Sequence, residues 1–313
     1  MSPAEHDLLV IGSGPAGLTA GLYAHRSGID VFMLGGDTPG GQVTMHYKVE
    51  NFPGFPGGVT GADLMTRWLR QVIDETDSMP VSESVKGVDF SRPAKEVHTE
   101  SATYRGRAVV IATGAGPRRM DVPGESEFQG KGVFYCATCD APLLRTMSRR
   151  RAVVVGGGDT ALHTSLALLP HAESVTIITR GERLRAKPAL IKRILKNKNV
   201  QVLVNLSVKA VIGDVATTAL LLEKKDTGEF EKFPVEAVFV GIGQSPNTSF
   251  LGGALHLSAD GSIVTDSSLQ TSIPGIFAAG DVRETPLRQI VTAAADGALA
   301  AHNAVQYLQI TGG

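Results

Sequence analysis

The feature that most constrains the fold is a strand–glycine turn–helix–strand unit that occurs twice in the chain. The first copy begins with the apolar run Leu8–Ile11, continues through the turn Gly12–Gly17 and ends with the run Asp30–Leu34. The second copy has the run Ala152–Val155, a turn of sequence GGGDTA and the run Ser174–Ile178. The copies align without a gap from the first glycine to the end of the second strand. The chain is therefore predicted to contain two units of the dinucleotide-binding type.

Each glycine-rich turn has the residue types that binding of a pyrophosphate requires. The first glycine permits a tight turn, the second lets the backbone approach the ligand, and the third small residue lets the helix pack closely on the strand. The helix that follows offers free N–H groups and a partial positive charge to an anion. The turn residues expected to contact a dinucleotide are Gly12, Gly14, Pro15, Ala16 and Gly17 in the first copy and Gly156, Gly158, Asp159 and Thr160 in the second.

The connections between the copies predict an α/β fold in which the second dinucleotide unit is inserted into the first. Two Pro-containing segments that each follow an apolar strand, Gly114–Pro117 and Gln244–Asn247, are expected to be linkers. We therefore expect two Rossmann-like domains, a discontinuous one formed by residues 1–117 and 247–313 and an inserted one formed by residues 118–246.

Composition is that of a soluble globular protein and excludes broad electrostatic partners. Of the 313 residues, 42% are hydrophobic and 19% are charged, and the net charge is −1, which argues against binding to nucleic acid or an anionic membrane. The apolar N-terminal run follows Glu5 and Asp7, where a signal peptide would have basic residues. No run has the length of an uncharged membrane span. We therefore expect a cytoplasmic protein.

The two cysteines of the chain, Cys136 and Cys139, are separated by two residues and followed by Asp140. In the cytoplasm such a pair is typical of catalytic or metal-binding sites. A Cys-x-x-Cys pair forms a readily reversible disulfide, and at the start of a helix the dipole lowers the pKa of the attacking thiol. A structural zinc site normally has four protein ligands, and the sequence has no second cysteine pair and no clear histidine cluster. We therefore expect a redox-active disulfide and no metal.

Over nearly its whole length the sequence resembles the low-molecular-weight thioredoxin reductase family. The segments that carry the resemblance, in the family's order and spacing, are GSGPAG (12–17), PGGQ (39–42), VENFPGF (49–55), ATGAGPR (112–118), CATCD (136–140), FAAGDV (277–282) and RQIVTAAADG (288–297). The resemblance implies that the first and last segments form an FAD-binding domain and that the inserted segment is a pyridine-nucleotide-type domain. It also implies a homodimer in which one domain swings to change the partner of the cysteine pair.

The resemblance further implies a role for each residue of the cysteine motif. Cys139 would take electrons from the flavin, and Cys136 would attack the disulfide of thioredoxin or a thioredoxin-like protein. Asp140 would be the general acid–base that protonates the departing thiolate, which requires burial to raise its pKa towards neutrality.

Flavin-binding positions also follow from the resemblance. Asp281 matches the aspartate that binds the ribityl chain, with a helix-capping role as the alternative. The start of the last helix, from about Arg288, would face the pyrimidine edge of the flavin, where a helix N-terminus stabilises negative charge. Gly35 and Gly36 stand where an acidic residue would bind ribose, so other groups must hold the adenosine. The remaining matched positions are Gly41, Gln42, Asn51, Ala112, Thr113, Gly114, Gly280, Gln289 and Ile290.

The residues expected to select the electron donor depart from the family's pattern. Members that use NADPH typically have His-Arg-Arg and a further Arg around the 2′-phosphate. This chain keeps Arg180 and Arg185 but has Thr179 and Gly181 at the positions of the His and the second Arg. No acidic residue ends the strand, which argues against NADH, and two arginines remain for a phosphate. NADPH is therefore the expected donor.

Three alternatives remain open at this point. His163 and Thr164 stand where the family has paired glutamates, so the same scaffold could be reduced by a non-pyridine donor such as ferredoxin, with another nucleotide or a second flavin in the second site. In the second alternative the site is vestigial, and its arginines are solvated charges. In the third the protein is a non-enzymatic flavin redox sensor.

Overall fold

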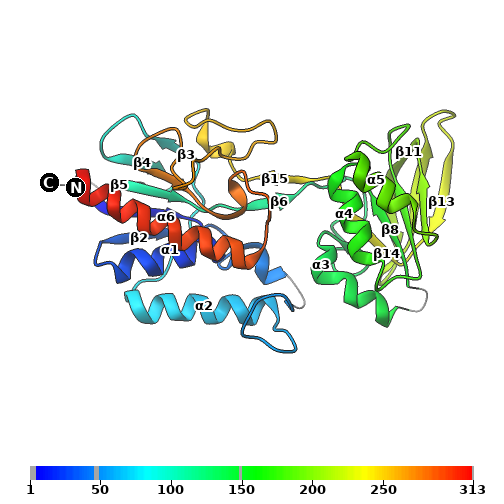
Figure 1. Ribbon diagram of the computed structural model, residues 1–313, viewed down its shortest axis with the longest axis horizontal. Helices are drawn as coiled ribbons and strands as arrows, with labels where there is room; N and C mark the ends of the chain where they lie inside the picture. Colours follow the sequence, from blue (N-terminus) through cyan, green and yellow to red (C-terminus); the bar gives the residue numbers. More distant parts are fainter. Residues whose placement is uncertain (1–4, 46–48, 148–149, 312–313) are drawn as a thin grey trace. The chain divides into compact units, whose positions relative to one another are not determined.

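The computed structural model describes residues 5–45, 49–147 and 150–311 and divides the chain into two compact units (Figure 1). Unit 1 comprises Met1–Gly116 and Ser245–Gly313, and unit 2 comprises Pro117–Gln244. No helix in the described part of the chain has the length and apolarity that crossing a bilayer requires.

Unit 1 is built on a six-stranded sheet in the order β2-β1-β5-β4-β3, with β16 also paired to β5. The strands are β1 (Glu5–Ile11), β2 (Val31–Leu34), β3 (Gly87–Asp89), β4 (Lys95–His98), β5 (Thr103–Ile111) and β16 (Ile276–Ala278). The pairs β1–β2, β1–β5 and β16–β5 are parallel, whereas β3 and β4 form an antiparallel extension. The parallel strands therefore end together, at the edge where the first glycine turn lies.

Three helices, α1 (Pro15–Arg26), α2 (Gly61–Thr76) and α6 (Ile290–Thr311), pack on the sheet of unit 1 (Figure 1). Leu8 and Val10 of β1 belong to the buried core that these helices share, while Leu9 and Ile11 belong to a second core on the opposite face. Alternate side chains of a strand point to opposite faces, so this strand is apolar throughout because both of its faces are covered. The unit also has the short 3-10 helices η1 (Gly41–Met45), η3 (Ser249–Leu251) and η4 (Gly280–Val282).

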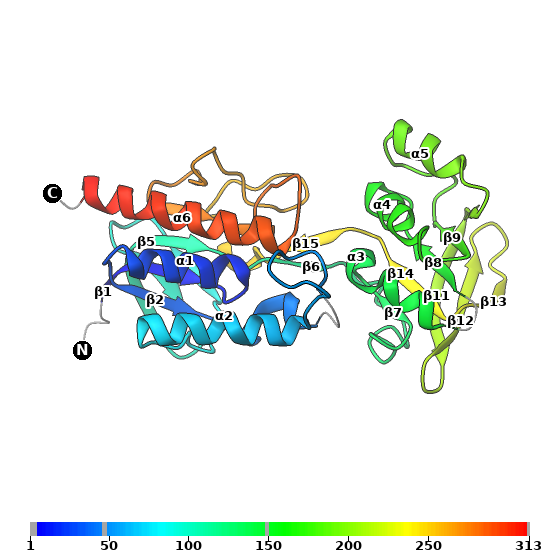
Figure 2. The ribbon, with the colours of Figure 1, turned by 60° about the horizontal axis from the view of Figure 1, so that its bottom comes forward.

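Unit 2 has a five-stranded parallel sheet in the order β10-β9-β8-β14-β7. Its strands are β7 (Val133–Phe134), β8 (Arg151–Val155), β9 (Ser174–Ile178), β10 (Val200–Leu203) and β14 (Ala237–Val240). The helical segments α3 (Ala137–Asp140), η2 (Ala141–Thr146), α4 (Asp159–Leu168) and α5 (Pro188–Leu195) lie on one side, and an antiparallel sheet of β11 (Leu206–Gly213), β12 (Thr217–Lys224) and β13 (Phe230–Pro234) lies on the other (Figure 2). Accordingly Val154 of β8 packs in the helix-side core, and Val153 packs with the antiparallel sheet.

The repeat seen in the sequence is a structural repeat. The units β1–α1–β2 and β8–α4–β9 have the same element order, and both strand pairs are parallel. The residues aligned from sequence take the same place in the sheets, since Leu8 pairs with Val31 and Ala152 pairs with Val175. The predicted α/β fold with two Rossmann-like units is confirmed.

The two segments expected to be linkers contain the boundaries between the units, and they form short strands that pair with each other. They are β6 (Ala115–Pro117) and β15 (Gln244–Pro246). Next to them the Asn247 backbone N–H donates to the carbonyl oxygen of Gly114 at 3.0 Å. Glycine and proline favour irregular backbone, but two extended segments that lie side by side satisfy each other's backbone groups. The sequence indicated two chain crossings between the units, but it did not predict that their backbones pair as strands.

Candidate functional site

The turn between β1 and α1 has a backbone that only glycine permits at two positions. Gly12 has a φ of +116°, and a Cβ there would collide with the carbonyl oxygen of Ala112. A Cβ on Gly17 would collide with the carbonyl oxygen of Gly12. Around the Cβ position of Gly14, by contrast, there is open space. The turn is therefore closed towards the sheet and open where a ligand would approach the start of α1.

Segments from distant parts of unit 1 meet at this turn. A Cβ on Gly41, in η1, would lie 3.3 Å from the Cα of Gly14, and a Cβ on Gly280, in η4, would lie 2.9 Å from the Cβ of Ala16. Pro15 is the first residue of α1, where its missing N–H leaves no hydrogen bond unmade. The structure thus brings together flavin-site residues that the sequence placed in separate motifs.

The end of β5 is joined to the same region. The Ala112 N–H donates to the carbonyl oxygen of Ile11 at 2.7 Å, which continues the pairing beyond the strand. The Thr113 hydroxyl donates to the carbonyl oxygen of Asn247 at 2.8 Å, and the Asn247 side-chain amide donates back to the Thr113 carbonyl oxygen at 2.8 Å. Ala112, Thr113 and Gly114 are therefore held in place by the returning chain.

Two charged side chains near η4 have polar atoms without a protein partner. Burial raises the pKa of Asp281 to about 6, against the opposing effect of Arg288, and its carboxylate accepts no hydrogen bond from the described residues. Arg288 donates from Nη2 to the Ser262 hydroxyl at 3.1 Å, but its Nε is buried and unpaired among the described residues. Such groups are normally satisfied, so a polar ligand is expected here. The carboxylate of Asp281 does not cap a helix in the described part of the chain.

The start of α6 is tied to the loop that contains Asn51. The Asn51 side-chain amide donates to Oε1 of Gln289 at 2.8 Å. The helix begins at Ile290, slightly later than the predicted start at about Arg288, because the Gln289 N–H donates to the Thr292 hydroxyl at 3.1 Å as a cap. Gln42 lies in η1 with an exposed side chain.

The second turn, between β8 and α4, repeats the geometry of the first. Gly156 has a φ of +139°, and a Cβ there would collide with a backbone carbonyl oxygen, whereas the Cβ position of Gly158 is open. Asp159 and Thr160 begin α4, and Oδ1 of Asp159 accepts a hydrogen bond from the Lys187 N–H at 2.8 Å. This second turn can therefore also receive a pyrophosphate.

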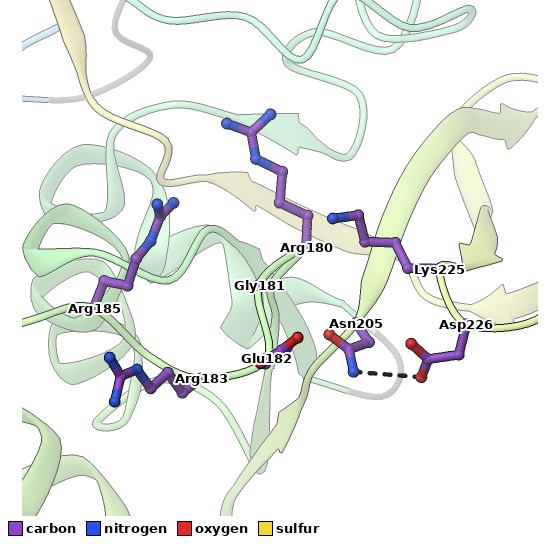
Figure 3. A pocket seen from close by; sticks show the side chains of 8 residues that line it. All are labelled: Arg180, Gly181, Glu182, Arg183, Arg185, Asn205, Lys225 and Asp226. Carbon is purple, nitrogen blue, oxygen red and sulfur yellow. Dashed lines mark hydrogen bonds between the residues drawn. The ribbon is translucent and has the colours of Figure 1, made fainter.

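Beside the second turn, unit 2 has a cavity of about 550 Å³ with a cationic lining. The lining residues, shown in Figure 3, are Arg180, Gly181, Glu182, Arg183, Arg185, Asn205, Lys225 and Asp226. None of the four cations makes an ion pair or a side-chain hydrogen bond within the described part of the chain. The residue directly after β9 is the buried Thr179, so no carboxylate stands at the strand end. Unpaired cations around an open cavity are suited to a phosphate.

The cysteine motif lies in the same unit as this cavity. Cys136 is disulfide-bonded and is the N-cap of α3, a single turn of helix that packs against α4. The side chains of Thr138 and Cys139 lie outside the described part of the structure. The Asp140 N–H donates to the carbonyl oxygen of Cys136 at 2.9 Å. The pair therefore begins a helix, as the sequence suggested, but this helix is only one turn long.

Asp140 has the acid strength that proton transfer near neutral pH requires. Burial raises the pKa of its carboxyl to about 6, and a hydrogen bond from the backbone of Cys136 partly opposes the shift. A carboxyl with this pKa exists in both protonation states around pH 6 and can both donate and accept a proton. No group of three or more His, Cys, Asp or Glu residues that could hold a metal occurs in residues 5–45, 49–147 and 150–311.

Several contributors to these sites were not predicted from the sequence. The buried Ser13 hydroxyl donates to the Gly35 carbonyl oxygen at 2.7 Å, and Asp296 accepts from the Gly280 N–H at 3.0 Å. Arg183 lies between two matched arginines and could have been noticed. Asn205 and Lys225 are far from the turn in the chain, and only the fold brings them to the cavity.

Comparisons with known proteins agree on one family. The family model described as pyridine nucleotide-disulphide oxidoreductase matches residues 6–297. A thioredoxin reductase from Peptoclostridium litorale is 38% identical over 310 residues, which cover 97% of each chain. One from Listeria innocua is 40% identical over 308 residues, covering 97% of this chain and 94% of the relative. The crystal structure of thioredoxin reductase from Streptococcus pyogenes MGAS5005 matches with a TM-score of 0.87 and 37% identity, covering 99% of this chain and 100% of that one.

The raised pKa of Asp140 predicts a specific pH dependence of stability. The carboxyl has a pKa of 3.8 when unperturbed and about 6 in the fold, so the native state holds the proton more tightly. The free energy of unfolding should therefore fall by roughly 2–3 kcal/mol as the pH rises from about 4 to about 6. Asp140→Asn should abolish this loss, so the variant should gain stability relative to the wild type across that interval and keep the advantage at pH 7.

The measurement is urea unfolding of both oxidised proteins at several pH values between 4 and 7.5. Asp281, whose pKa is also raised to about 6, titrates in both proteins and cancels in the difference. Parallel stability curves for the two proteins would contradict the shifted pKa of Asp140.

Proposed function

The chain belongs to the pyridine nucleotide-disulphide oxidoreductase family and is an oxidoreductase of the thioredoxin reductase type, and on this premise we propose that it passes electrons from NADPH through FAD and the Cys136–Cys139 pair to thioredoxin or a thioredoxin-like protein. The family is FAD-dependent, with NADPH as its usual electron donor. The observation that carries the proposal is the disulfide-bonded Cys136 beside Asp140, in the unit that also holds a dinucleotide turn.

The residues of unit 1 fit FAD. The open side of the turn at Gly14 and the N-terminus of α1 would hold the pyrophosphate, and Asp281 would accept hydrogen bonds from ribityl hydroxyls. The Nε of Arg288, which has no hydrogen-bond partner in the described part of the chain, would donate to an acceptor of the ligand. When bound, FAD supplies the two-electron carrier between a nicotinamide and a disulfide.

The residues of unit 2 would carry out thiol–disulfide exchange. In the reduced enzyme, the Cys136 thiolate would attack the disulfide of the partner, forming a mixed disulfide and releasing the partner's other sulfur as a thiolate. Asp140 would give that thiolate its proton. Attack by the Cys139 thiolate on the mixed disulfide would then restore the Cys136–Cys139 disulfide and release the partner's second sulfur as a thiolate, which takes its proton from water. The pKa of about 6 supports this role for Asp140.

The comparisons bear on two of the alternatives that the sequence left open. Membership of an oxidoreductase family makes the protein an enzyme, in place of the non-enzymatic redox sensor. Ferredoxin as donor is not favoured, since the relatives reported above are thioredoxin reductases and the cavity in unit 2 is lined by cations that have no ion pair among the described residues. A homodimer and a cytoplasmic location are part of the proposal. The cysteine pair is compatible with that location, because the disulfides found in the cytosol are usually transient and catalytic.

Cys136→Ser and Cys139→Ser should each reduce thioredoxin-dependent turnover at least about tenfold, because exchange needs both sulfurs. Both variants should still bind FAD, which the wild type carries in unit 1, and dithionite should still reduce the flavin. Turnover is measured with thioredoxin and NADPH, and the bound flavin is identified after denaturation. Full turnover in either variant, or release of FMN in place of FAD, would exclude the proposed relay.

Replacement of Gly181 by arginine should strengthen the use of NADPH. Gly181 is outside the left-handed φ region, and the atom nearest to an added Cβ is 3.5 Å away, so a side chain fits. A charge-assisted hydrogen bond contributes about 1.5–3 kcal/mol, so Gly181→Arg should raise the apparent NADPH affinity roughly tenfold or more. The wild type should use NADPH weakly but in preference to NADH.

Stopped-flow reduction of the flavin by NADPH and by NADH gives these affinities. Gly181→Met, which adds length without charge, is the matched control and should resemble the wild type. Equal or better reduction by NADH would refute the assignment of the cavity to a 2′-phosphate. If neither nucleotide reduces the flavin, before or after the substitution, the electron donor would be a non-pyridine donor.

A further inference from the structure

We propose that Lys225 determines specificity for the 2′-phosphate of the nucleotide, by supplying from the β12–β13 turn a cation that the chain lacks at Gly181. This inference rests on the proposed function, because it places the adenosine end of NADPH in the cavity of unit 2. It adds a residue that lies outside the arginine segment that follows β9 and that enters the cavity from a different part of the fold.

The backbone holds Lys225 close to Gly181 through a single intervening residue. The Asn205 N–H donates to the carbonyl oxygen of Gly181 at 3.1 Å, and the Lys225 N–H donates to the carbonyl oxygen of Asn205 at 2.9 Å. Asn205 has a φ of +57°, a left-handed conformation that asparagine tolerates better than most residues. The position of Lys225 relative to the arginine segment is therefore fixed by main-chain hydrogen bonds.

The side chain of Lys225 is free to bind an anion. It is exposed, and Figure 3 shows its ammonium group directed towards the side of the cavity where Arg180 lies. The preceding residue, Lys224, is paired with Glu229 at 3.3 Å, whereas Lys225 has no ion pair with any described residue. The adjacent acid, Asp226, accepts a hydrogen bond from the Asn205 side-chain amide at 3.3 Å.

A positive charge at Lys225 would discriminate between NADPH and NADH. Lys225 and Arg180 carry like charges on the same cavity and repel each other until an anion lies between them. A 2′-phosphate relieves that repulsion and accepts hydrogen bonds from both groups, whereas the 2′-hydroxyl of NADH carries no charge to do so.

Calorimetric titration of the full-length, FAD-loaded protein tests the assignment without any turnover. The probes are adenosine 2′,5′-bisphosphate, which has the 2′-phosphate, and 5′-AMP, which lacks it. Lys225→Ala should weaken binding of the bisphosphate about tenfold and leave binding of 5′-AMP unchanged. Lys225→Arg should retain the wild-type affinity. Lys232→Ala removes an exposed lysine of β13 that does not line the cavity, and it should change neither affinity.

A double variant tests whether positions 181 and 225 supply the same charge. If they do, Gly181→Arg should raise the affinity for the bisphosphate by a larger factor in the Lys225→Ala background than in the wild type. If the wild type prefers the bisphosphate but Lys225→Ala binds it equally well, the assignment of Lys225 is wrong and the NADPH proposal stands. An equal loss for both probes would also overturn the assignment, since the lysine would then act on the nucleotide in general. A wild type without any preference for the bisphosphate would overturn both proposals.

Discussion

The close approach of backbone to backbone at the two glycine turns is the constraint on which the rest of the structure depends. At the first turn, the carbonyl oxygens of Ala112 and Gly12 occupy the space that a Cβ on Gly12 and on Gly17 would fill. At the second, Gly156 meets a carbonyl oxygen in the same way. A methyl group at any of these positions would displace a strand or a helix, at a cost of about 1–3 kcal/mol or more. Each glycine turn therefore lets the helix that follows it pack closely on its sheet. The N-terminus of that helix then lies at the turn, where a pyrophosphate would bind.

The chemistry of the protein depends on charges that the fold leaves only partly compensated. Asp281 and Asp140 are partly buried, and burial raises the pKa of each carboxyl to about 6. In unit 1 such a carboxyl is suited to accept hydrogen bonds from a sugar chain, and in unit 2 it is suited to move a proton beside Cys136. The cations around the cavity of unit 2 are exposed and unpaired among the described residues, which costs little in water and leaves them available for phosphate.

The sequence was sufficient to predict features that depend on neighbouring residues. The strands and helices around each glycine turn follow from local periodicity and turn chemistry, and they are present in the structure with small shifts at their ends. The pairing of β6 with β15 could not be predicted in this way, because it joins segments that are distant in the chain. The same holds for Lys225, an ordinary turn lysine until the backbone of Asn205 joins it to Gly181. The burial of Asp281 and the hydrogen bond of Arg288 to Ser262 also depend on packing, which local sequence does not encode.

The central claim is that electrons from NADPH reach the cysteine pair, and quantitative alkylation after anaerobic reduction tests it most directly. The oxidised, FAD-loaded protein is mixed with NADPH in small excess, quenched in acid, treated with a thiol-specific reagent and analysed by peptide mass spectrometry. We expect two alkylated positions, Cys136 and Cys139, in a yield that follows the NADPH consumed. Oxidation of NADPH with both cysteines still in the disulfide would contradict it.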